Sequence, residues 1–247
     1  MEPIFRQTHT VDALATDRFG KLKPSMLLYY LQEAAGAHFA TLEDKTAPIA
    51  GKRLFWAVTR HRLVISRLPR LGEKITVETW PMPTTRVAYP RAVAFYDENG
   101  RELARAISLW VLMDMETRAM VLPGKSGVTV NGILRGCEPE APKSLMPKEL
   151  PNSVTHTVTY SLLDKNGHMN NTRYLDWVSD LLPAAFHQSH CPAEIVLCYL
   201  SEALEGQHIS LCYGLSEAGE LTVDAHRAST SVCAKTERVF SAQVRYL

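Results

Sequence analysis

Four polar side chains alternate with other residues between Asp164 and Asn170, and their types suit chemistry at a carbonyl group. The segment reads Asp164-Lys165-Asn166-Gly167-His168-Met169-Asn170-Asn171-Thr172-Arg173-Tyr174. In an extended or looped backbone, alternate side chains emerge on one side. An imidazole or a carboxylate there can accept a proton, and an amide N–H can stabilise negative charge on oxygen. The spacing therefore favours a site for a polarised carbonyl oxygen.

A strand, a polar loop and a helix start are the elements expected to hold these side chains. Gly167 allows a tight turn, and Asn170 or Asn171 can cap the helix that follows. The unpaired N–H groups of a helix N-terminus also attract negative charge. A plain surface turn is the alternative, because Asp, Asn and Gly are ordinary turn residues.

Residues 8–20 and 155–167 are two copies of one pattern. Each copy begins with Thr-His-Thr-Val, and an aspartate and a glycine follow at identical spacing without a gap. Where the second copy has Asn166 and His168, the first has Phe19 and Lys21. A shared turn explains the common residues but not this difference. We therefore predict that the second copy is catalytic and the first is a degenerate copy.

Both copies precede the same order of elements, which predicts an α+β fold with a long helix wrapped by an antiparallel sheet in each half. Apolar residues recur at helical spacing from Leu27 to Phe39 and from Tyr174 to Phe186, and Pro183 should kink or end the second helix. Branched and aromatic residues predict strands at 56–65, 74–80, 88–96, 102–114, 119–122, 195–200, 208–215, 221–227 and 237–246.

The two halves are expected to be separate domains. Prolines at 139, 142, 147 and 151 and several charges indicate an exposed linker between them. The predicted boundaries are an N-terminal domain over 1–133, a linker over 134–152 and a C-terminal domain over 153–247.

The composition is that of an ordinary globular protein, with 46% hydrophobic and 21% charged residues. A net charge of +1 gives no reason to expect nucleic-acid or membrane partners. The N-terminus lacks a signal-like apolar core, no apolar run reaches membrane-spanning length, and five irregularly spaced cysteines form no disulfide framework. We therefore expect a cytoplasmic protein. No cofactor fingerprint is present, and His187-x-x-His190-Cys191 lacks a second ligand pair, so no metal site is predicted.

The chain resembles the acyl-acyl carrier protein (acyl-ACP) thioesterases of plants and bacteria over nearly its whole length. The most specific match is Asp164-x-Asn166-x-His168-x-Asn170-Asn171-x-x-Tyr174, similar to the Asp-x-Asn-x-His-x-Asn-Asn signature of that family. In Leu197-Cys198-Tyr199-Leu200-Ser201-Glu202-Ala203, Glu202 matches a family glutamate, while Ala203 stands where many plant members have cysteine. The resemblance implies a tandem (double) hotdog fold that hydrolyses fatty acyl-ACP.

The resemblance implies catalytic roles for Asp164, Asn166, His168 and Glu202. Because Ala203 cannot serve as a thiol nucleophile, water is the expected attacker, with either His168 or Glu202 as the general base. Asn166 would donate to the carbonyl oxygen, and Asp164 would orient its neighbours; direct attack by the Asp164 carboxylate to form an anhydride is the variant to exclude.

The resemblance further implies an acyl carrier protein partner whose phosphopantetheine arm carries the acyl chain. Substrate contacts are expected from Asn170, Asn171 and Tyr174, and from Trp56 in an acyl tunnel of the first half. Further tunnel candidates are Met26, Tyr30, Phe55 and Trp110. A basic surface for the carrier protein is expected at Arg60, Arg62, Arg67, Arg70, Lys21 and Lys23. Either a monomer or a homodimer is compatible with paired hotdog halves.

Two rival functions are open at this point. One is another hotdog enzyme, either an acyl-coenzyme A thioesterase or a dehydratase. The other is a non-catalytic acyl-binding protein, which would have little need for all four catalytic candidates.

Overall fold

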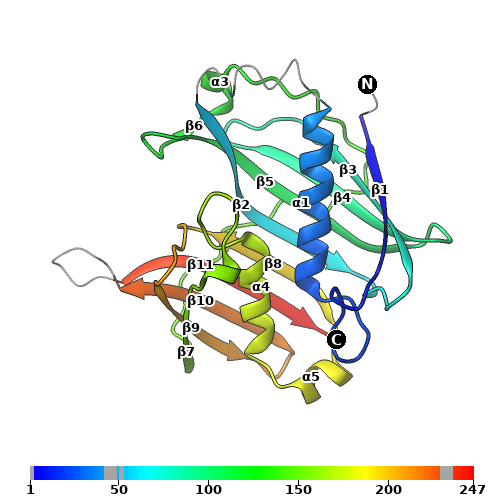
Figure 1. The fold of residues 1–247 in the computed structure, drawn as a ribbon, viewed down its shortest axis with the longest axis vertical. Helices are drawn as coiled ribbons and strands as arrows, with labels where there is room; N and C mark the ends of the chain where they lie inside the picture. The colour runs from blue at the N-terminus through cyan, green and yellow to red at the C-terminus, as the bar shows by residue number, and fades with distance from the viewer. Residues whose placement is uncertain (1–2, 42–48, 50–52, 229–235) are drawn as a thin grey trace. The chain divides into compact units, whose positions relative to one another are not determined.

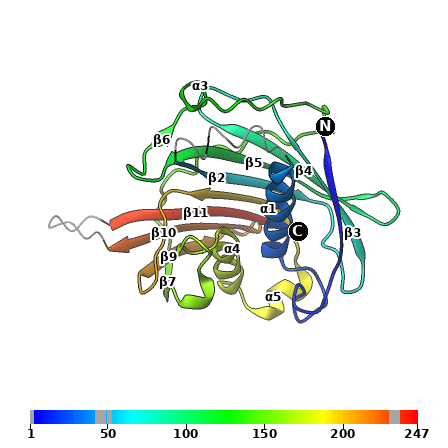
Figure 2. The same cartoon turned by 45° about the horizontal axis from the view of Figure 1, so that its top comes forward.

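The computed structural model describes residues 3–41, 49, 53–228 and 236–247. The chain divides into unit 1, Met1–Pro142, and unit 2, Lys143–Leu247 (Figures 1 and 2). Each unit has a helix followed along the chain by most of its antiparallel strands, as the repeated sequence pattern predicts.

Unit 1 has one long helix and an antiparallel sheet with strand order β1-β3-β4-β5-β2, to which β6 adds beside β5. The helix, α1, packs against β1 and β3. The elements are β1 (Phe5–Thr10), α1 (Pro24–Ala40), β2 (Leu54–Ile65), β3 (Lys74–Pro81), β4 (Tyr89–Asp97), β5 (Glu102–Asp114), β6 (Met120–Val121) and the short helix α3 (Pro123–Ser126).

Helix α1 forms where the sequence places a proline ahead of an apolar stripe. Pro24 occupies the first turn, where its missing N–H costs nothing. Leu27, Leu31 and Ala34 recur at helical spacing and are fully buried. Burying each leucine contributes about 1.5–3 kcal/mol, which makes packing on the sheet the main support of this helix.

Unit 2 repeats the arrangement with a shorter helix and the strand order β8-β11-β10-β9-β7. As predicted, Pro183 ends the helical run, and a second short helix starts just after it. The elements are β7 (Asn152–Thr157), the 3-10 turn η1 (Tyr160–Leu162), α4 (Asn171–Asp180), α5 (Ala184–Ser189), β8 (Pro192–Tyr199), β9 (His208–Leu215), β10 (Glu220–Ala228) and β11 (Thr236–Tyr246).

The predicted strands are all present, and two, β5 and β9, have the predicted bounds. The segment just before Asp164 differs from the expectation of a strand that leads directly into the polar loop. The strand, β7, ends at Thr157, and η1 occupies the interval. The physical reason is that Leu162 and Leu163 bond back to Thr159 and Tyr160, which turns the chain before the loop begins.

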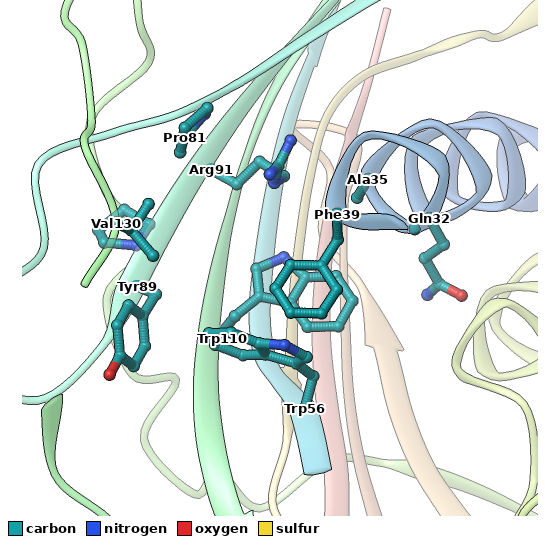
Figure 3. Close-up of a pocket in the computed structure, with 11 residues that line it drawn as sticks. Gln32, Ala35, Phe39, Trp56, Pro81, Tyr89, Arg91, Trp110 and Val130 are labelled. Carbon is teal, nitrogen blue, oxygen red and sulfur yellow. The ribbon is translucent and has the colours of Figure 1, made fainter. Parts of the chain in front are cut away.

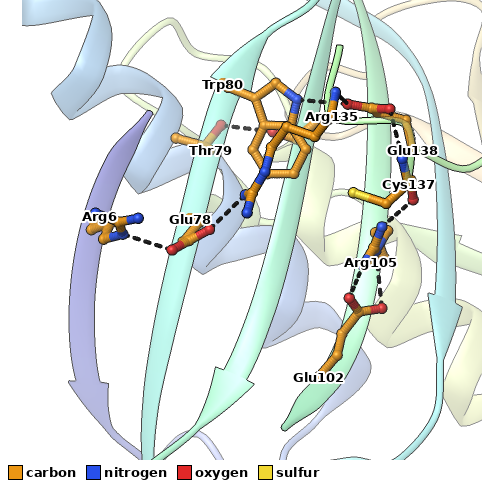
Figure 4. A network of polar contacts seen from close by, with 10 residues as sticks. Arg6, Glu78, Thr79, Trp80, Glu102, Arg105, Arg135, Cys137 and Glu138 are labelled. Carbon is orange, nitrogen blue, oxygen red and sulfur yellow. Dashed lines mark hydrogen bonds and ion pairs between the residues drawn. The ribbon is translucent and has the colours of Figure 1, made fainter. Parts of the chain in front are cut away.

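The beginning of the proline-rich stretch is fixed to unit 1 by polar contacts rather than left free (Figure 4). Side chains alternate along β3, so Glu78 and Trp80 lie on the face opposite Thr79. Arg135 donates to Glu78 at 2.6 Å and stacks over the Trp80 ring at 4.6 Å. The Trp80 indole N–H donates to Glu138 at 3.0 Å. Burial alone would raise the pKa of Glu78, but hydrogen bonds from Arg6 and Arg135 outweigh it and leave the pKa below its ordinary value.

Within the described residues, no helix is both long and apolar enough to cross a membrane. Cys137, Cys198 and Cys212 are free thiols. Cys233 lies outside the described residues.

Candidate active site

The polar loop of unit 2 is a closed turn built around Asp164. Its Oδ1 accepts the backbone N–H groups of Asn166 at 2.8 Å and His168 at 3.3 Å. Its own N–H donates to the His168 carbonyl at 2.8 Å. Gly167 supplies the positive φ of 78° that the turn needs. The turn fixes the backbone from which Asn166 and His168 project.

Asn170 begins helix α4 by capping it. Its Oδ1 accepts the Thr172 N–H at 2.9 Å and the Thr172 hydroxyl at 2.8 Å. Asn171 is the first helical residue, and its carbonyl accepts the Tyr199 hydroxyl at 2.8 Å. The Asn170 side chain therefore caps helix α4, and the Asn171 carbonyl binds the first turn of α4 to Tyr199.

Glu202 reaches the turn because its segment pairs with the chain after Gly167. The Met169 N–H donates to the Ala203 carbonyl at 2.8 Å, and His168 and Leu204 form an antiparallel bridge. This pairing places His168 Nε2 3.3 Å from Glu202 Oε2. The side chains are 22% and 45% exposed, so the pair is accessible to a substrate.

Arg227 on β10 holds the Glu202 segment from its other side. It donates to the Glu202 carbonyl oxygen, to Ser201 Oγ at 2.8 Å and to Gln207 Oε1 at 2.9 Å. It also pairs with both carboxylate oxygens of Glu237. Hydrogen bonds from Ser201 and Arg227 lower the pKa of Glu237. Sequence reasoning missed Arg227, since its partners come from distant parts of the chain and no local motif marks it.

Tyr174 projects into the core of unit 2. It is 2% exposed and meets Tyr199 and Phe240 edge-on, with ring centroids 5.4 and 4.8 Å away. Burial raises the pKa of Tyr174 well above its ordinary value. Its position anchors α4 to β8 and β11, and its predicted contact with substrate stays a prediction.

The first copy of the sequence pattern forms the same turn in unit 1. Asp17 Oδ1 accepts the backbone N–H groups of Phe19 at 2.8 Å and Lys21 at 2.9 Å, and Gly20 has a φ of 70°. The Leu22 N–H donates to the Pro69 carbonyl at 2.8 Å, which matches the Met169–Ala203 bond of unit 2. By this register, the place of Glu202 is taken by Leu68, which is buried.

Unit 1 has a cavity of about 160 Å³ between α1 and the sheet (Figure 3). Trp56 and Trp110 line it, and their contact with an acyl chain stays a prediction. Tyr30 is buried and stacks on His9 at 4.4 Å, while Phe55 lies against Arg118. The cavity walls also include Gln32, Ala35, Gly36, Phe39, Pro81, Tyr89, Pro90, Arg91 and Val130.

Part of the predicted basic surface is engaged within unit 1. Arg67 forms a two-bond pair with Glu73 at 2.8 and 2.9 Å. Arg62 lies 3.7 Å from Glu140. These carboxylates reduce the charge that the surface could present to a carrier protein, whose docking position stays a prediction.

Two family models match the chain. The acyl-ACP thioesterase N-terminal domain matches residues 2–122, and the acyl-ACP thioesterase C-terminal domain matches residues 146–241. The chain belongs to the acyl-ACP thioesterase family. The matched segments cover both copies of the turn.

Solved structures of acyl-ACP thioesterases share the fold over their full length. An acyl-ACP thioesterase from Bacteroides thetaiotaomicron is 23% identical, with 99% of this chain and 98% of that one covered at a TM-score of 0.80. A 12:0-ACP thioesterase from Umbellularia californica is 21% identical, with 100% and 98% covered at a TM-score of 0.82. The predicted tandem hotdog of the α+β class is confirmed.

Two curated relatives of this acyl-ACP thioesterase family member are chloroplastic plant proteins. A chloroplastic palmitoyl-acyl carrier protein thioesterase of Gossypium hirsutum is 28% identical over 191 residues, which cover 71% of this chain and 46% of the relative. A chloroplastic oleoyl-acyl carrier protein thioesterase of Arabidopsis thaliana is 28% identical over 183 residues, which cover 67% of this chain and 50% of the relative. The chain spans about half the length of these relatives.

Proposed function

We propose that this protein hydrolyses fatty acyl-ACP thioesters to free fatty acid and ACP, which terminates fatty-acid synthesis. The observation that carries the proposal is the 3.3 Å contact between His168 Nε2 and Glu202 Oε2, next to the turn that presents Asn166. Family membership supports the substrate class. The cytoplasmic location and the monomeric or homodimeric state stay predictions.

The proposed reaction uses water, because Ala203 offers no nucleophile. Water attacks the thioester carbonyl carbon as one of its protons passes to the His168–Glu202 pair. Either His168 or Glu202 can take that proton, and the close contact lets the other residue stabilise the protonated one. The C–S bond then breaks, and the proton leaves with the phosphopantetheine thiolate as a thiol.

Asn166 is proposed to stabilise the oxyanion of the tetrahedral intermediate. Its side-chain nitrogen lies 3.4 Å from Asp164 Oδ2, which orients the amide, and an amide NH₂ retains a second N–H for the substrate oxygen. Asp164 is then a positioning residue. Two backbone N–H groups stabilise its carboxylate, which makes the anhydride variant the weaker alternative.

The test is thiol release from matched acyl-ACP and acyl-coenzyme A series by the wild type, His168→Ala and the control His208→Ala. His208 is an exposed histidine on β9 of the same unit, bonded to Thr157. We expect rapid release from the carrier-protein series, lost about 10²- to 10⁴-fold in His168→Ala alone. Release from coenzyme A only would reassign the substrate. Binding of acyl chains without release from either series would identify a binding protein.

A single-turnover reaction in ¹⁸O-labelled water detects an anhydride that water opens at the Asp164 carbonyl. Water attack places the label in the fatty acid on the first turnover. Label in the Asp164 carboxylate would show an anhydride instead and would overturn the proposed role of Asp164.

A further inference from the structure

Arg91 on β4 extends toward α1 beside the cavity of unit 1 (Figure 3). Its Nη1 donates to Thr79 Oγ1 at 3.1 Å and contacts His38 Nδ1 at 3.2 Å. An arginine can only donate, so the His38 Nδ1 is the acceptor. His38 is therefore a neutral imidazole with its proton on Nε2, and it brings no negative charge to Arg91.

Most of the hydrogen-bonding capacity of Arg91 is unused within the described part of the chain. Nη1 supplies two of the five N–H donors of a guanidinium, and Nε and Nη2 have no partner among the described residues. No carboxylate there pairs with Arg91 either. Burial lowers the pKa of Arg91 to about 10, so the group is still cationic at neutral pH. Arg91 is half-buried, and a cation that loses part of its hydration without a counter-charge in return is destabilising.

Other walls of the same cavity also carry donors without acceptors. The indole nitrogens of Trp56 and Trp110 and the side-chain nitrogen of Gln32 are buried and have no hydrogen-bond partner among the described residues. The remaining walls are mostly apolar, with Phe39 edge-on to Trp56 at 5.6 Å. The cavity thus combines an apolar lining with an excess of N–H donors.

The size of the cavity suits the end of an acyl chain. Its volume of about 160 Å³ is close to the roughly 150 Å³ of an engineered cavity that takes benzene, so about six chain atoms would fit. A purely hydrocarbon end would fill the space and leave the cation and the indole N–H groups unpaired. An end with an oxygen would fill the space and also accept hydrogen bonds.

We propose that this cavity receives an acyl chain that carries an oxygen acceptor far from the thioester, with Arg91 donating to that oxygen. A terminal carboxylate is the best match, because it also neutralises the guanidinium. A terminal hydroxyl is the neutral form of the same chemistry. The inference rests on the proposed thioester hydrolysis for its kinetic test, and on direct binding for an independent test.

The kinetic test compares kcat/KM for acyl-ACP substrates of equal chain length that end in methyl, hydroxyl or carboxylate. We expect the wild type to favour carboxylate over methyl by about 10- to 100-fold, the range for a hydrogen bond to a charged group. Arg91→Met should remove or reverse this preference, Arg91→Lys should keep part of it, and Trp110→Phe should weaken it less. Equal preference in the wild type and in Arg91→Met would overturn the inference.

The binding test uses alkyl thioethers of pantetheine, which cannot be hydrolysed, with the same three ends. Calorimetry should give tighter binding of the carboxylate-ended thioether to the wild type than to Arg91→Met, and the same ranking in the His168→Ala background. This ranking without any hydrolysis would refute the proposed function and keep the inference. Hydrolysis with a preference for methyl ends would support the proposed function and refute the inference about Arg91. Thermal unfolding of each variant verifies that it is folded.

Discussion

The turn at Asp17 in unit 1 and the turn at Asp164 in unit 2 have the same hydrogen bonds and present different side chains. In each, an aspartate Oδ1 binds the N–H groups two and four residues later, and a glycine takes a positive φ. The aspartate and the glycine are therefore needed to build the turn, whether or not it is catalytic. The catalytic candidates are the side chains that occur in the turn of unit 2 alone, Asn166 and His168.

The comparison also divides the family signature by physical role. Asp164 and Asn170 are engaged in backbone contacts, while Asn166 and His168 project from a backbone that those contacts fix. A residue shared by both turns primarily stabilises the backbone of the turn. A residue found in one turn is the better candidate for contact with the substrate.

The largest contrast is expected between Asn166→Ala and Phe19→Ala, which truncate equivalent positions of the two turns. Losing one oxyanion donor should lower kcat about 10²- to 10³-fold in Asn166→Ala. Phe19→Ala should leave kcat at the wild-type value. Thiol release under saturating acyl-ACP measures both, and equal losses in the two variants would remove the catalytic distinction between the turns.

A smaller contrast is expected for the shared aspartates. Asp164→Ala and Asp17→Ala each lose two hydrogen bonds to backbone N–H groups, which should reduce the free energy of unfolding by about 1 kcal/mol in both. Only Asp164→Ala should also lower kcat, by at least about tenfold, because Asn166 and His168 lose their frame. Urea unfolding and thiol release give the two quantities. An unchanged stability in either variant would contradict the structural role.

Arg227 belongs to unit 2 and holds Glu202 through its backbone carbonyl, so it tests whether the position of Glu202 matters for catalysis. Arg227→Met should lower kcat about tenfold with little change in KM, since the carboxylate would be less well placed rather than removed. Arg227→Lys should recover part of the loss. Arg245→Met, which breaks the 3.5 Å pair with Glu194 on the same unit, is the matched control. A pH–rate profile unchanged in shape together with full activity would show that Arg227 has no positioning role.

The last contrast concerns pH and one pair of residues on neighbouring strands of each unit. His61 on β2 is fully buried and bonds to Ser108 on β5 at 2.8 Å, whereas the matching pair in unit 2 is Ile195 and Val244. Burial lowers the pKa of His61 to about 3. Between about pH 6.5 and 3, the unfolded chain therefore binds a proton at His61 that the folded chain does not.

Unfolding free energy should consequently fall with acidification through that window, by up to about 1.4 kcal/mol per pH unit from this group, and show no such contribution above pH 6.5. The double variant His61→Ile with Ser108→Val copies the apolar pair of unit 2 and should remove this part of the slope. Urea unfolding at a series of pH values measures it. An identical slope in the variant would show that His61 is not responsible.

Local patterns predicted much of the fold and the turn. The bounds of β5 and β9 followed from branched runs next to strong turn residues, and the end of α4 before Pro183 followed from the missing N–H of proline. The Asp164 turn was visible because its bonds join residues close in sequence. Which of its residues stabilise the turn itself became clear only when the hydrogen bonds of both turns could be compared.

Long-range contacts were harder to predict. The proximity of Glu202 to His168 was expected from family resemblance, since no local pattern joins the two residues. Arg227 and Arg91 were missed for the same reason: each binds groups from other elements, and an isolated arginine in a strand has no periodic signal. Trp56 was predicted to line an acyl tunnel of the first half, and it lines the cavity of unit 1, but whether that cavity holds an acyl chain stays a prediction.

Ala203 gives the candidate site a particular resistance to chemical damage. A catalytic thiol would be open to alkylation and to stepwise oxidation, which end its activity. The methyl group at this position is fully buried and has no such reactivity. Turnover that relies on an imidazole, a carboxylate and an amide would continue under oxidising conditions that inactivate an enzyme with a cysteine nucleophile.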